Sequence, residues 1–259
     1  MKARKYELTD QHHPSASWLR RIRALVDMPR YGVRAGDLGG WVESEGCLAQ
    51  SGDAWVFGDA RVFGDAQVYG DARVSGAARV SGDAWVSGDA QVSGDARVSG
   101  DARVYGAAQV YGDARVSGDA WVSGDARVSG AARVSGDAWV SGDAWVSSDA
   151  WVSGDARVYG AARVSGDAQV SGPDHTLTAG PLSSQGHHGT LTRQPGNAHQ
   201  IMIGCWTGTV DQLRALATSD DWPSGCDQQA HERYAPRLLA FAALCEAQVA
   251  LWTDAEELS

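Results

Sequence analysis

The chain has 259 residues and a formal net charge of −10, with 32 Gly, 11 Trp and only 3 Phe. This length allows one large domain or a domain with appendages, but a composition so rich in glycine excludes an ordinary globular core. No apolar run reaches the 18 residues that a membrane helix needs, and the basic N-terminus lacks the apolar stretch of a secretory signal, so we expect no membrane contact.

Residues 1–51 are expected to form an N-terminal cap. Residues 5–9 (K-Y-E-L-T) predict a short strand, and residues 19–25 predict a second strand or a short helix. Residues 39–42 (G-G-W-V) then lead into a degenerate coil that continues to Leu48. The cap is needed because the end of any strand stack exposes unpaired backbone groups.

Residues 52–172 repeat the pattern G-[DA]-A-x-V-[SYF] with a period of six. Valine recurs at every sixth position from Val56 to Val170, which gives 20 copies without insertion, and the glycine fails once, at Ser148. In A-x-V the first and third residues share one face of a strand, so Ala and Val point inward and x points outward. The following Gly-Asp pair predicts a corner, because glycine relaxes the backbone there.

An aliphatic residue at i and a small residue at i+4, as in the hexad V-F-G-D-A-R of residues 56–61, resembles the hexapeptide-repeat superfamily of left-handed parallel β-helices. The resemblance implies three hexads per coil, hence 18 residues per coil and about 6.7 coils. The expected fold is mainly β: a left-handed parallel β-helix with a small N-terminal cap and a C-terminal α+β module. The G-G-W-V lead-in is similar to those of bacterial and prophage hexapeptide-repeat proteins, which implies a phage or prophage origin.

The C-terminal part has a different character. Pro173 ends the repeat, residues 173–188 are expected to be a linker, and residues 189–259 are expected to form a β-hairpin plus helices. The hairpin is predicted at 189–193 and 199–203, and a capping box of Thr209 and Gln212 predicts a helix to about residue 217. A longer helix is predicted over about 231–252. Its apolar stripe consists of Tyr234, Leu238, Phe241, Cys245, Val249 and Trp252.

Stacking of residues 18 apart predicts charged columns on the surface. The arginine column is Arg61, Arg79, Arg97, Arg115 and Arg133. The aspartate column, at the corner that follows, is Asp65, Asp83, Asp101, Asp119, Asp137 and Asp155. The columns could bind an anion such as nucleic acid, or neutralise each other. Because the repeat has 16 Asp against 10 Arg, neutralisation is favoured and nucleic acid is not an expected partner.

A second face is predicted to carry one aromatic side chain per coil. Its members are Tyr69, Trp85, Tyr105, Trp121, Trp139 and Tyr159, with Arg103 and Arg157 between them. Continuous apolar surface usually marks a contact site, so we expect self-association or a protein partner here. The alternative is that large β-forming residues are simply tolerated on a sheet. Trp139, Trp145 and Trp151 are also predicted to surround the rod on three successive sides.

The residues that catalysis would need are missing from the repeat. Hexapeptide acyltransferases place a histidine on or near the coils, often with an excursion loop, and residues 52–172 contain neither. Outside the repeat lie His12, His13, His187, His188, His199, Cys205, Cys226 and His231. Their spacing fits no zinc pattern, so no metal or cofactor is expected. His199 and Cys205 would be ~20 Å apart along one strand, whereas pairing of Cys205 with His231 stays open.

We therefore expect a non-enzymatic β-helical scaffold or binding protein, homo-oligomeric or bound to a protein partner through the aromatic face. Irregularly spaced cysteines (Cys47, Cys205, Cys226 and Cys245) favour the reducing cytoplasm of a bacterial host. Two alternatives stay open. One is a phage counter-defence binder that mimics nucleic acid or sequesters a small charged ligand; the other is an acyltransferase relative with a site outside the coils.

Overall fold

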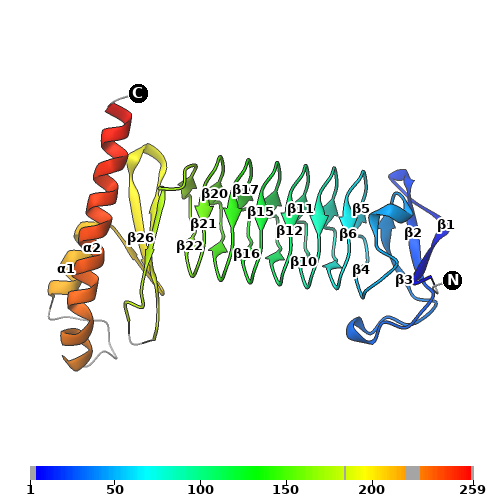
Figure 1. Ribbon diagram of the computed structural model, residues 1–259, viewed down its shortest axis with the longest axis horizontal. Helices are drawn as coiled ribbons and strands as arrows, with labels where there is room; N and C mark the ends of the chain where they lie inside the picture. The colour runs from blue at the N-terminus through cyan, green and yellow to red at the C-terminus, as the bar shows by residue number, and fades with distance from the viewer. Residues whose placement is uncertain (1–3, 184, 220–227, 258–259) are drawn as a thin grey trace.

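The protein is a rod with a different small module at each end (Figure 1). The computed structural model describes residues 4–183, 185–219 and 228–257. Each hexad of the repeat forms one two-residue strand at x-V, and successive strands belong to three parallel sheets in turn. The predicted parallel β-helix with 18 residues per coil is therefore confirmed as a β-solenoid of about seven turns.

The three sheets of the solenoid are named here by their outward residues. The arginine sheet holds β5 (Arg61–Val62), β8 (Arg79–Val80), β11 (Arg97–Val98), β14 (Arg115–Val116), β17 (Arg133–Val134), β20 (Trp151–Val152) and β23 (Gln169–Val170). The aromatic sheet holds β6 (Gln67–Val68), β9 (Trp85–Val86), β12 (Arg103–Val104), β15 (Trp121–Val122), β18 (Trp139–Val140) and β21 (Arg157–Val158). The third sheet holds β4 (Trp55–Val56), β7 (Arg73–Val74), β10 (Gln91–Val92), β13 (Gln109–Val110), β16 (Arg127–Val128), β19 (Trp145–Val146) and β22 (Arg163–Val164).

The core of the rod is a stack of alanine and valine. All 20 repeat valines are fully buried, together with the alanines two positions before them. Each coil donates backbone hydrogen bonds to the next, as from Arg97 N to Ala114 O at 2.9 Å. Because only small side chains point inward, the coils are narrow, and main-chain pairing between coils satisfies the buried polar groups.

Glycine is required at the corners for two reasons. At Gly112, φ is +72°, and an added Cβ would lie 3.1 Å from the backbone nitrogen of Gly130 in the next coil. The same approach recurs along each corner. Ser148, with φ of 61°, is the one non-glycine residue with positive φ among the described residues. The single break in the glycine series is therefore also a point of backbone strain.

The N-terminal cap consists of antiparallel strands that extend the arginine sheet. These are β1 (Tyr6–His13), β2 (Ala16–Ala24) and β3 (Leu38–Val42), with 3-10 turns at Pro29–Tyr31 and Glu45–Cys47. The segment left open between strand and helix is therefore a strand. Strand β3 pairs in parallel with β5, with Val42 opposite Val62. This spacing of 20 residues, against 18 in the coils, makes the first coil irregular, as its degenerate sequence predicts.

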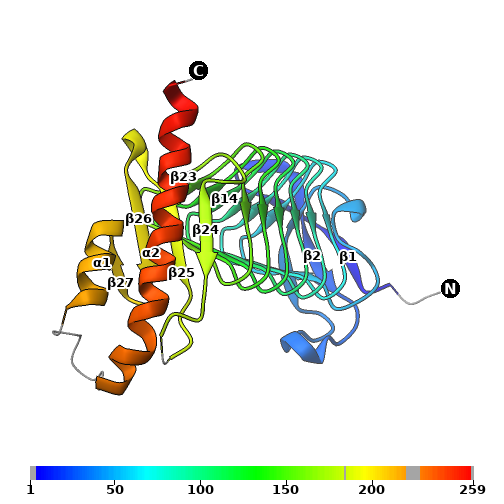
Figure 2. The same ribbon diagram turned by 60° about the vertical axis from the view of Figure 1, so that its left-hand side comes forward.

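The C-terminal module is a four-stranded antiparallel sheet covered by two helices (Figure 2). The elements are β24 (Thr176–Ala179), β25 (Gly189–Arg193), β26 (His199–Ile203), β27 (Trp206–Gly208), α1 (Val210–Thr218) and α2 (Gln228–Glu257), with a 3-10 turn at Pro195–Asn197. The predicted hairpin, the capping box of Thr209 and Gln212, and the long helix are all present. The described helices include none long and apolar enough to cross a membrane.

The segment predicted as a linker, residues 173–188, contributes a strand instead. β24 pairs with β25 over four residues, with Leu177 opposite Leu191. The composition of this segment, which is rich in Gly, Ser and His, favours a linker. The short strand forms because its backbone pairs with β25. The sheet then packs against the last coils: Arg163 N donates to Thr190 Oγ1 at 3.0 Å, and Thr176 Oγ1 donates to Arg157 O at 3.3 Å. The end of the solenoid is thereby covered.

Candidate interaction surfaces of the solenoid

The aromatic sheet carries a ladder of one ring per coil, in which Tyr69–Trp85 and Tyr105–Trp121–Trp139 form two groups of touching rings. The tryptophans stand at the outward x position of their strands, and the tyrosines directly after the buried valine. Trp121 lies opposite Trp139 in register, with ring centroids 5.7 Å apart. Tyr69 contacts Trp85, and Tyr105 contacts Trp121, both edge-to-face at 6.3 Å. The predicted stacking of residues 18 apart, on which the charged columns and the aromatic face depend, is confirmed.

An arginine lies within this ladder. The guanidinium of Arg103 is 5.3 Å from the ring of Trp85 and 5.0 Å from that of Trp121, so it lies between two indoles. Arg157 follows Trp139 in register. A guanidinium stacks favourably on an indole because the ring face is electronegative. The outward sequence Trp, Arg, Trp, Trp, Arg therefore includes one step, from Trp121 to Trp139, with no arginine between the rings.

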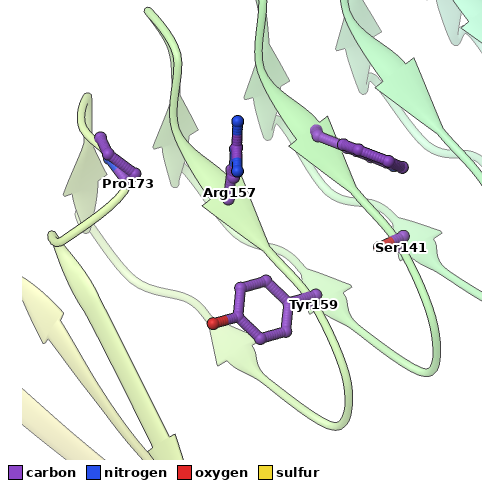
Figure 3. Close-up of a pocket in the computed structure, with 5 residues that line it drawn as sticks. Ser141, Arg157, Tyr159 and Pro173 are labelled. Carbon is purple, nitrogen blue, oxygen red and sulfur yellow. The ribbon is translucent and has the colours of Figure 1, made fainter.

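Several of these rings are open to solvent. The exposed fraction is 41% for Trp85, 42% for Trp139 and 65% for Tyr159. A shallow pocket of about 420 Å³ is lined by Trp139, Ser141, Arg157, Tyr159 and Pro173 (Figure 3). A second, of about 390 Å³, is lined by Asp101, Arg103, Asp119, Trp121, Asp137 and Trp139. The exposed aromatic surface is therefore hollowed and bordered by charge.

The arginine column runs along the neighbouring sheet. Arg79, Arg97, Arg115 and Arg133 are exposed and follow each other in register, while Arg61 is half-buried near the cap. The aspartate column is exposed at the corner between the arginine and aromatic sheets. Within the described part of the chain, no ion pair within 4.0 Å joins the two columns. The expected mutual neutralisation therefore does not take the form of direct ion pairs.

A different corner shows what an aspartate column can bind. Asp71 and Asp89 are one coil apart on the opposite border of the aromatic sheet, and both pair with Arg30 from the N-terminal cap. The distance from Arg30 Nη1 to Asp71 Oδ2 is 2.7 Å. One guanidinium can thus bridge two successive steps of a column. Sequence patterns do not indicate this contact, because Arg30 lies in a short 3-10 turn 41 residues before Asp71.

Ionisable groups at the N-terminal end close the first coil. Lys5 Nζ donates to Ala54 O at 2.8 Å, and burial lowers the pKa of Lys5 to about 8 against the attraction of Asp53 and Asp71. Tyr6 Oη donates to Leu48 O at 2.7 Å, and burial raises the pKa of Tyr6. These groups satisfy backbone carbonyls, so their role is structural.

The described histidines and cysteines outside the coils are spread over the N-terminal cap and the C-terminal module. His199 Nε2 accepts a hydrogen bond from Val210 N at the start of α1, and burial lowers its pKa. Cys47 and Cys245 are buried free thiols, whereas Cys205 is exposed. Cys226 lies outside the described residues, as does the side chain of His231. The described His, Cys, Asp and Glu residues include no group of three that could hold a metal.

Seven segments of the solenoid match a protein-family model described as YdcK Beta solenoid repeat. They are residues 66–82, 78–94, 90–106, 108–124, 132–148, 150–166 and 156–172. The repeat region is similar to the YdcK β-solenoid repeat family. Each segment spans about one 18-residue coil, so the YdcK repeat coincides with the structural unit seen here. No curated protein matches the chain.

Proposed function

We propose that the chain is a non-enzymatic β-solenoid scaffold that binds protein through its aromatic sheet. The observation that carries the proposal is the exposed ring ladder, with one aromatic side chain on every coil from Tyr69 to Tyr159. Tryptophan and tyrosine contribute strongly to protein interfaces, because they bury a large area with few rotatable bonds. The strands beneath are locked by the buried core, so little conformational entropy is lost on binding.

Comparison with the third sheet argues against simple tolerance of large side chains. That sheet has Trp55, Phe57, Tyr111 and Trp145, which are scattered rather than continuous. Trp55 is only 1% exposed and contacts Tyr6 edge-to-face, so it serves the cap. Aromatic residues occur on all three sheets, but only the aromatic sheet carries one on each of six successive coils. This regular series supports a contact function for that sheet.

The chemistry of the coils supports a role without catalysis. Residues 52–172 contain no histidine or cysteine, and every inward position of the regular coils is a buried alanine or valine. The proposal includes the bacterial or prophage origin indicated by the G-G-W-V lead-in, the hexapeptide-repeat assignment, and a cytoplasmic location. A homo-oligomer and a complex with another protein are both compatible with it.

The test compares two variants of the full chain. The first combines Trp85→Ser, Trp121→Ser and Trp139→Ser on the aromatic sheet. The control is Trp145→Ser, which removes an indole of similar exposure (36%) from the third sheet. Circular dichroism checks that both keep the solenoid, light scattering measures mass, and a protein captured from bacterial lysate is purified and titrated against each variant.

We expect the triple variant to lose association and the control to keep it, because only the first removes the ring ladder. Equal mass and equal affinity for the purified partner in the triple variant and the wild type would refute the proposed contact face.

A further inference from the structure

We propose that the partner of the aromatic sheet is the arginine column of a second copy of this chain. The inference rests on the proposed function and names the occupant of its contact face. Two copies would lie side by side, with Arg79, Arg97, Arg115 and Arg133 of one set against the ring ladder and aspartate column of the other. This contact is supported in four steps by charge, spacing, precedent within the molecule and the shape of the groove.

The first step is charge. Arg97 lies between Arg79 and Arg115 in register on adjacent strands, so like charges are stacked one strand apart. The aspartate column stacks carboxylates in the same way at the corner. Like charges directly opposite each other on a sheet are destabilising. The two columns have opposite signs, and the described residues show no ion pair between them within one molecule. Each therefore fits the other on a second copy.

The second step is spacing. Both columns repeat once per coil, a rise of ~4.8 Å. Both also occupy the same coils, since Arg97 and Asp101 lie four residues apart and so do Arg133 and Asp137. Two parallel copies can therefore match step for step without an axial shift. A nucleic-acid strand advances only about 3.4 Å per phosphate, so its charges would fall out of register with the arginines within a few coils.

The third step is precedent within the molecule. Arg30 pairs with Asp71 and Asp89, which stack on neighbouring coils. Arg103 lies between the rings of Trp85 and Trp121. The two halves of the proposed contact, arginine on stacked aspartates and arginine against indole rings, are thus both formed inside this chain. The arginine column of a second copy would repeat them along the opposite border of the sheet.

The fourth step is the shape of the groove. The hollow of about 390 Å³ brings together Asp101, Asp119 and Asp137 with the rings of Trp121 and Trp139, and Arg103 of the same chain also lines it. It lies at the one step of the ladder where two indoles follow each other without an arginine. A planar guanidinium can rest on an indole while it donates to a carboxylate, which an ammonium does less well. The basic residues of the column are all arginine.

Contact between two different faces has a consequence for assembly. A pair of copies keeps one free arginine column and one free aromatic sheet, so association continues until a ring closes or a filament forms. A contact of aromatic sheet with aromatic sheet is disfavoured, because the aspartate corners that border each sheet would approach each other. The two faces can therefore be disabled separately and then recombined.

The experiment uses two charge-reversal variants of the full chain. One carries Arg97→Glu and Arg115→Glu, which leaves its aromatic sheet intact. The other carries Asp101→Lys and Asp119→Lys, which leaves its arginine column intact. Arg127→Glu on the third sheet is the matched control. Light scattering and sedimentation velocity at low and high salt measure mass, and circular dichroism confirms the fold.

The wild type and the control are expected to exceed the monomer mass at low salt and to dissociate at high salt. Each double variant should associate at least about tenfold more weakly. A mixture of the two double variants should recover association, because the intact arginines of one meet the intact aspartates of the other and the introduced glutamates meet the introduced lysines.

Two results would overturn the inference: a wild type that is monomeric at every salt concentration, or a double arginine variant that associates as the wild type does. A monomeric wild type whose purified partner is lost in the triple tryptophan variant would overturn this inference alone. If the triple tryptophan variant kept both self-association and binding to the purified partner, both this inference and the proposed function would be overturned.

Discussion

Replacing Ser148 with glycine should stabilise the solenoid. Ser148 occupies the corner position that is otherwise glycine in every hexad, and its φ is 61°. The left-handed conformation brings Cβ close to the following carbonyl and costs an L-residue about 1–2 kcal/mol. Glycine removes that cost, but its greater conformational freedom in the unfolded chain lowers the free energy of unfolding by about 0.5–1 kcal/mol. The expected net gain for Ser148→Gly is therefore about 0.5–1 kcal/mol.

The neighbouring serine provides the matched control. Ser147 has negative φ, and its amide donates to Val164 O at 2.9 Å, so Ser147→Gly relieves no strain. Only the flexibility of the unfolded chain changes, and stability should fall by about 0.5–1 kcal/mol. The reverse change, Gly112→Ala, imposes left-handed strain and places Cβ 3.1 Å from Gly130 N. It should lower stability by at least about 1–2 kcal/mol.

Urea denaturation followed by far-ultraviolet circular dichroism measures all three variants. At equal slope, the midpoint should move up for Ser148→Gly and down for Ser147→Gly and Gly112→Ala. Opposite signs for the same substitution at adjacent residues would identify backbone conformation as the cause. If Ser148→Gly destabilised the chain as much as Ser147→Gly does, the assignment of strain to this corner would be wrong.

Three further predictions concern the ends and the core. Thr209→Ala removes the side chain that accepts from Gln212 N, and should lower the stability of the C-terminal module by about 1 kcal/mol in thermal unfolding. Lys5 has a pKa lowered by burial from 10.5 to about 8, so the unfolded state holds the proton longer. The free energy of unfolding should rise from pH 8 to 10.5 relative to Lys5→Met; a constant difference in urea midpoints would contradict this. Val116→Ala leaves a cavity in a fully buried layer and should cost about 1–3 kcal/mol in urea unfolding, whereas an unchanged midpoint would mean that the coil collapses around it.

The positions of the outward side chains could be predicted from the sequence because the six-residue repeat contains no insertion or deletion. With valine at every sixth residue, one inference about coil length places every outward side chain, and the pairings of Arg97 with Arg115 and of Trp121 with Trp139 confirm it. The C-terminal helices could also be predicted from the sequence. The capping box at Thr209 and the stripe beginning at Tyr234 are local patterns that need no knowledge of distant residues.

The remaining features depend on contacts that are distant in sequence. Strand β24 was missed because four residues carry little periodicity, and its pairing with β25 decides its conformation. Strand β2 was ambiguous because its apolar residues fit both periods, and pairing with β1 and β3 selects the strand. The bridge from Arg30 to Asp71 and Asp89 depends on the fold of a cap loop. Periodicity cannot report any of these contacts.

The assignment of successive hexads to three sheets in turn constrains how such a chain can change in length. Loss or gain of one whole coil, as between Arg97 and Arg115, shortens or lengthens the rod and leaves every column continuous. Loss or gain of a single hexad would instead move every later hexad from its own sheet to a neighbouring one of the three sheets. The C-terminal module would then be rotated by a third of a revolution relative to the N-terminal strands, and tryptophans would be aligned above arginines. Genetic variation in this protein should therefore occur in steps of eighteen codons.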